Sequence, residues 1–178
     1  SGILGPLSQM FGSKFIGKYP RKKIVMAGVL LESIMWLPFI AIAILFYLNM
    51  LTKVLPLFIL LTFAFFVISG SFAVPAWFSW MGDITEEKHR GRFFSKRNLL
   101  TGFTSVVLAI AASFFLDYFK SKNWIMFGFI ILFSLAFIAR LISWHLFSKK
   151  YDPKIKVKDD DHFSFFSFIV QAPKTNFG

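Results

Sequence analysis

Two charged side chains interrupt long apolar runs of the sequence, and they are the first candidates for chemistry. Glu32 lies eight residues after Ile24, and Arg140 lies seven residues before Phe147. If both runs are helices, each charge is about 11–12 Å from the end of its run. Their similar depth and opposite sign predict an ion pair. The pair would serve either proton or substrate coupling through Glu32, or the packing of two helices.

A second group of charges follows the apolar run that ends near Met81. Asp83 stands at the end of this run, and Glu87, Arg90 and Arg92 come after it. Glu87 and Arg90 are three residues apart, so they can pair if the segment is helical, and Gly91 would permit a tight turn. The mixture of acids and bases indicates a charge motif that forms in one conformation and breaks in another. The alternative is an ordinary basic loop.

Other signals for chemistry are weak. Residues 12–18 match the start of a phosphate-binding loop, but Tyr19 replaces the Ser or Thr that would hold Mg²⁺. The run Asp159–Asp161 is typical of a solvated acidic segment. The chain has no cysteine, and the spacing of its histidines matches no metal motif: His89, His145 and His162. We therefore expect no metal, no cofactor and no catalytic residues.

The elements that position these charges follow from composition. Of 178 residues, 56% are hydrophobic and 26 are Phe, while only 16% are charged, where about a quarter is usual for soluble domains. A globule of this size cannot bury so much apolar material, and disordered chains are poor in aromatic residues. A nucleic-acid partner would explain the net charge of +11 but not the apolar runs. The composition predicts an all-α integral membrane protein with the lipid bilayer as its partner.

Four apolar runs are long enough to cross a bilayer as helices. The chain begins with Ser rather than Met, and we interpret it as a piece of a longer protein whose remainder is missing. Pro38, Pro75 and the segment Ser69–Ser71 interrupt the runs, as in the broken helices of transport pathways. The predicted spans are residues 24–48, 54–81, 99–119 and 124–147, with a truncated fifth at residues 1–17. A face of small residues predicts close helix packing in the third complete span: Gly102, Ser105, Ala109 and Ala112.

Basic residues between the spans predict the orientation. The successive connecting regions, from the first loop to the tail, hold 5, 1, 5, 2 and 6 Lys and Arg. The positive-inside rule therefore places residues 18–23, 82–98 and 148–178 in the cytoplasm. The membrane is predicted to be the inner or plasma membrane of the cell. Residues 163–170 are too short to span. They predict either a helix in the membrane interface or an apolar patch that covers the protein's own cytoplasmic face.

The charge motif resembles the loop between the fourth and fifth helices of major facilitator superfamily transporters. In that family an Asp at the end of the fourth helix precedes an acidic residue and Arg-Gly, as Asp83, Glu87 and Arg90-Gly-Arg92 do here. Residues 17–23 are similar to the family's loop between the second and third helices. Pro20 stands where that pattern has its second Gly, and Gly17 stands where it has Asp.

The resemblance implies that the chain runs from part of helix two through helix six to the start of the central loop at residues 148–178. It also implies secondary active transport of a small solute by alternating access, with a proton, another cation or the solute's own gradient as energy source. Arg21 or Lys22 would pair with Asp83. Glu32 and Arg140 would lie on peripheral helices, which favours the packing role. Ser69, Ser71 and Trp77 are candidates for the cavity wall. The alternative functions are a multi-span sensor and a membrane-embedded enzyme.

Overall fold

A computed structural model describes residues 3–16 and 18–153 of the chain. This part is mainly helical and contains no strand, and four of its helical segments are long and apolar enough to cross a membrane. The prediction of an all-α membrane protein is confirmed. The helices are α1 (Leu4–Ser13), α2 (Arg21–Ile34), α3 (Trp36–Tyr47), α4 (Leu55–Phe72), α5 (Val74–Ile84), the short 3₁₀ helix η1 (Glu87–His89), α6 (Arg90–Ser121) and α7 (Ile125–Ser148).

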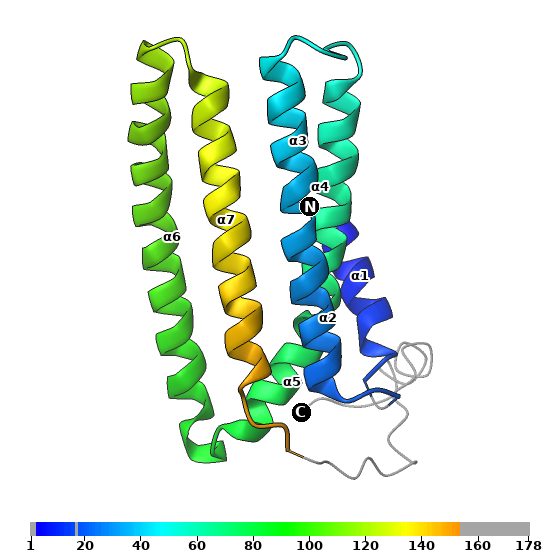
Figure 1. Ribbon diagram of the computed structural model, residues 1–178. Coiled ribbons are helices and arrows are strands. Elements are labelled where there is room, and N and C mark those ends of the chain that lie inside the picture. The colour runs from blue at the N-terminus through cyan, green and yellow to red at the C-terminus, as the bar shows by residue number, and fades with distance from the viewer. Residues whose placement is uncertain (1–2, 17, 154–178) are drawn as a thin grey trace.

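Two of the spans are broken by proline. Pro38 has no backbone N–H to bond the carbonyl of Ile34 and its ring crowds that carbonyl, so α2 ends at Ile34 and α3 begins at Trp36. Pro75 acts in the same way, and α4 ends at Phe72. Helix α5 then leaves the direction of α4 and crosses toward the start of α6 (Figure 1).

Helix α6 begins earlier than the sequence indicated. It starts at Arg90 and runs for 32 residues, so the basic segment expected to be a loop up to residue 98 forms its first turns. Arg, Lys and Leu are strong helix formers, and no proline interrupts them. The expected turn at Gly91 is wrong, because this glycine lies inside the helix and its φ is not positive.

Asparagine ends two of the helices at the end of the bundle opposite α5. Asn49 and Asn123 have φ values of 54° and 62°, in the left-handed region that Asn tolerates. After α6, the N–H of Asn123 donates to the carbonyl of Lys120, and the N–H of Trp124 donates to that of Phe119. These two bonds define a Schellman motif, which satisfies the last carbonyls of the helix. The same pair of bonds follows α3.

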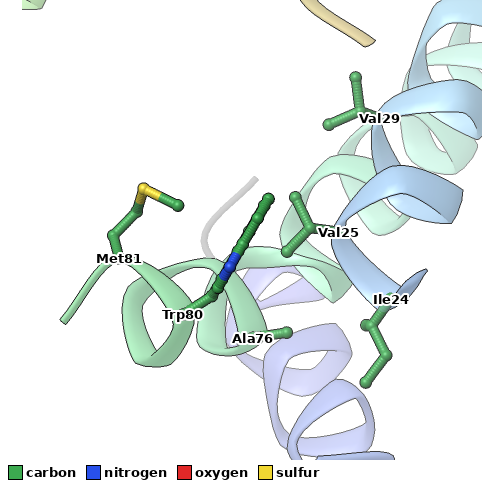
Figure 2. Packing of buried hydrophobic residues seen from close by; sticks show 6 residues of the cluster. All are labelled: Ile24, Val25, Val29, Ala76, Trp80 and Met81. Carbon is green, nitrogen blue, oxygen red and sulfur yellow. The ribbon is translucent and has the colours of Figure 1, made fainter. Parts of the chain in front are cut away.

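The spans pack side by side, with α7 between α6 and the α2–α3 pair, and with α4 and α1 beyond (Figure 1). The buried core lies where α2 begins and α5 ends, and Figure 2 shows Val25 of α2 against Trp80 of α5. We call this the basic end, because residues 18–23, 82–98 and 148–150 all lie there (Figure 1). The core consists of Ile24, Val25, Val29, Ala76, Trp80 and Met81.

Helix α6 has no buried residue. The small residues Gly102, Ser105 and Ala109 are exposed, and a Cβ at Gly102 would meet no atom within 4 Å. The close packing predicted for this face is therefore not present within residues 3–16 and 18–153. Close approach occurs instead at Gly12 and Gly28, where a Cβ would lie 2.2 Å from the Phe72 carbonyl oxygen and 2.5 Å from the Ala73 Cβ. These glycines bring α1 and α2 onto the break between α4 and α5.

Candidate functional site

An ion pair joins the first residue of α2 to the last turn of α5 at the basic end. The guanidinium of Arg21 donates to the carboxylate of Asp83, 62 residues away in sequence. The two side chains are 20% and 33% exposed, so the pair is half-buried rather than fully solvated. Of the two basic residues that the sequence offered as partners of Asp83, the structure selects Arg21.

Lys22 has a different partner, the end of α7. Its Nζ donates to the backbone carbonyls of Ser148 and Lys150, both at 2.7 Å. Ser148 is the last residue of α7 and Lys150 lies just beyond it, so neither carbonyl has an N–H partner within the helix. The indole Nε1 of Trp80 donates to the carbonyl of Tyr151 at 3.1 Å. Lys22 of α2 and Trp80 of α5 therefore anchor the chain where it leaves the end of α7.

Arg90 also bonds to backbone rather than to an acid. Its Nε donates to the carbonyls of Gly82 at 2.7 Å and Thr85 at 3.3 Å. The Glu87–Arg90 pair expected from their spacing is absent from the described part of the chain, because Arg90 instead satisfies carbonyls where α5 ends. Glu86 pairs with His89 across the 3₁₀ turn at 3.1 Å. Arg92 is exposed near the start of α6.

Within the spans, Arg140 of α7 donates to the carboxylate of Glu32 of α2. The Glu32 side chain is 13% exposed and that of Arg140 is 36% exposed. Gly70 of α4 leaves room for the carboxylate, since a Cβ there would lie 3.2 Å from the Glu32 Cδ. This contact gives one residue of the Ser69–Ser71 segment a structural explanation.

A cavity of about 350 Å³ lies beside this pair, and we call it the central cavity. Its wall combines residues of α2, α4, α5, α6 and α7, and it carries the charges of Glu32, Arg140 and Arg97. The guanidinium of Arg97 lies 4.6 Å from the centre of the Trp77 ring, a cation–π contact, and donates to the side-chain oxygen of Asn98 at 3.0 Å.

Of the three residues named as candidates for a cavity wall, Trp77 lines the central cavity. Ser69 and Ser71 are not part of its wall, and Ser71 instead faces α1, with its Oγ 3.3 Å from the position of a Cβ on Gly5. Arg97 is the residue that sequence reasoning missed. Its position next to an apolar span could have indicated a role in the cavity. The positive-inside rule, however, groups it with the four other basic residues of the predicted cytoplasmic loop.

A second cavity, of about 280 Å³, lies between α3, α4 and α7 toward the opposite end. Aromatic and aliphatic side chains form its wall, including Phe39, Phe129 and Phe133, and no polar surface lines it. Trp36 and Phe66 extend the aromatic packing beside it. Its chemistry suits hydrocarbon alone.

Sites of other kinds find little support in the described residues. No three His, Asp or Glu side chains among them gather in a way that could hold a metal ion. Residues 4–13 form α1, a helix, where a phosphate-binding loop requires a preceding strand. The acidic run Asp159–Asp161 and the segment 163–170 lie outside the described residues.

Comparison with known proteins adds one finding. The sequence profile described as Major Facilitator Superfamily matches residues 1–175. No curated protein and no solved structure matches the chain.

Proposed function

The chain belongs to the Major Facilitator Superfamily, a family of membrane transporters, and we propose that it moves a small solute as a secondary active transporter by alternating access. In such transporters, bundles of helices rock around a central site that opens to one side of the membrane at a time. The four candidate spans make the chain a multi-pass membrane protein. The energy comes from a proton or cation gradient or from the gradient of the solute itself.

The observation that supports this mechanism most directly is the Arg21–Asp83 pair. It ties the start of one broken span to the end of another, next to the buried core and on the same side as the basic loops. A half-buried ion pair has little net free energy, so it can break and re-form without a large cost. We assign it the role of a latch between two conformations, with Lys22 and Arg90 holding the neighbouring helix ends in place.

The basic end faces the cytoplasm in this proposal. The sequence assigns it by the positive-inside rule, and the fold supports that assignment by gathering residues 18–23, 82–98 and 148–150 at one end of the bundle (Figure 1). Lys and Arg at this end would face the anionic lipids of the cytoplasmic leaflet. The membrane is the cell's inner or plasma membrane.

The test is uptake by proteoliposomes that contain the full-length protein, with a panel of radiolabelled sugars, amino acids and organic acids. We expect saturable uptake of one class and its loss in Asp83→Asn, with partial recovery in the double variant Arg21→Asp with Asp83→Arg. The matched control is Asp117→Asn, an exposed carboxylate on α6 far from the latch. Full uptake by Asp83→Asn would contradict the latch, and no uptake of any solute would contradict the transporter.

A further inference from the structure

We propose that the central cavity binds a small organic anion, with one carboxylate held by Arg97 and an apolar body packed on Trp77 and Phe78. The proposal rests on the function proposed above and names its substrate class.

The charges of the central cavity do not cancel. Glu32 and Arg140 neutralise each other through their ion pair. The guanidinium of Arg97 has no carboxylate within ion-pair distance in residues 3–16 and 18–153, and within those residues it donates a hydrogen bond only to the neutral side chain of Asn98. Arg97 is exposed in the first turns of α6, at the basic end of the bundle and at the edge of the central cavity. One positive charge therefore remains for a ligand to neutralise.

The chemistry of Arg97 selects the kind of anion. A guanidinium is planar and presents parallel N–H groups that match the two oxygens of a carboxylate. The face of Trp77 lies 4.6 Å from this guanidinium and holds it from one side. Stacking of this kind orients the guanidinium plane and leaves its N–H groups available to a ligand.

The rest of the wall is apolar and limits the ligand's body. Trp77, Phe78 and Phe147 contribute aromatic surface, while Val25 and Val29 contribute aliphatic surface. A volume of about 350 Å³ is at the small end of the range for ligand sites, about 300–1,000 Å³. A monocarboxylate with a short aliphatic or single-ring body satisfies both the charge and the wall.

The experiment is calorimetric titration of the full-length protein in phosphatidylcholine nanodiscs, where no anionic lipid competes. The probes are two carboxylates, phenylacetate and hexanoate. Phenylacetamide and phenethylamine are the neutral and the cationic control for phenylacetate, because they carry the same ring. We expect both carboxylates to bind and the two matched probes to bind at least tenfold more weakly. Absence of binding by both carboxylates, or equal binding of phenylacetamide, would overturn the proposal.

Substitutions of Arg97 test whether this residue provides the positive charge that binds the carboxylate. Arg97→Gln should weaken phenylacetate binding at least tenfold and Arg97→Lys less, while Lys96→Gln, the neighbouring exposed base outside the cavity wall, should bind as the unmodified protein does. Unchanged binding in Arg97→Gln would overturn the assignment. Uptake is measured separately: carboxylate binding without uptake of any solute contradicts the transporter and leaves the site standing, whereas uptake without carboxylate binding contradicts the site alone.

Discussion

Individual side chains in the spans and at the basic end differ in what their removal costs. Glu32 lies within a span, and its loss would leave the guanidinium of Arg140 without a partner in a poorly solvated place. Asp83 lies at the end of a span, in the last turn of α5 at the basic end. The first pair is therefore suited to permanent packing and the second to breaking and re-forming.

Glu32→Gln should lower the stability of the protein by about 1–2 kcal/mol, because Arg140 loses its partner, and its 36% exposed side chain makes this loss smaller than the roughly 3 kcal/mol of a fully buried unpaired charge. The loss should appear as a lower thermal unfolding midpoint in detergent, with recovery in the double variant Glu32→Arg with Arg140→Glu. If the pair serves packing, the pH dependence of transport should stay the same in Glu32→Gln. Glu86→Gln, at an exposed carboxylate, is the control, and an altered pH profile in Glu32→Gln alone would assign Glu32 to coupling instead.

The sequence allows ion-pair partners to be predicted where both partners are charged side chains. Glu32 and Arg140 were paired from sign and depth, and Asp83 was given two basic candidates. The partners of Lys22 and Arg90 are backbone carbonyls, and these cannot be predicted because a carbonyl carries no residue identity in a sequence. Helix ends supply such carbonyls, and their position is known only once the helix boundaries are known.

Helices approach one another most closely at two glycines, and this gives a prediction for the element scale. Gly28→Ala would place its Cβ 2.5 Å from the Ala73 Cβ and force α2 away from the α4–α5 break. Overpacking of this kind costs about 1–3 kcal/mol, measured as a lower unfolding midpoint. The matched control is Gly91→Ala in α6, where the Cβ meets nothing within 4 Å and removal of a helical glycine should stabilise by about 0.5 kcal/mol. Equal effects of the two changes would contradict the packing.

The turn between α6 and α7 gives a second prediction at this scale. Asn123 has a φ of 62°, which a β-branched residue adopts at a cost of about 1–2 kcal/mol. Asn123→Val should therefore lower the unfolding midpoint, while Asn123→Gly should leave it nearly unchanged. A midpoint for Asn123→Val equal to that of Asn123→Gly would show that the turn does not require this conformation.

Element boundaries show where periodicity and composition were insufficient. Pro38 and Pro75 correctly marked interrupted spans, because a missing N–H acts locally. The start of α6 at Arg90 was missed, since a hydropathy pattern follows lipid contact and not helicity, and the first turns of this helix are polar. The small-residue face of α6 lacks a neighbour among the described residues, and a sequence pattern alone does not name the helix that would cover it.

The whole molecule presents a simple test of orientation, because the chain has no cysteine. Single variants Ser95→Cys, at the basic end, and Ser121→Cys, at the opposite end, each introduce one thiol at an exposed position. In whole cells a membrane-impermeant maleimide should label Ser121→Cys at once and Ser95→Cys only after permeabilisation. The reverse labelling would place the basic end outside and contradict the proposed side of the latch.

The Glu32–Arg140 pair has a consequence for the order of synthesis. The two residues are 108 positions apart in the chain, and ribosomes add about 5–20 residues per second. The carboxylate of Glu32 therefore waits about 5–20 s before the ribosome has made its partner. During that interval the span that contains α2 has no guanidinium to neutralise it, so α2 completes its packing only when α7 arrives. During insertion of this bundle, the packing of α2 is therefore completed only after α7, the last helix of the described chain, has been synthesised.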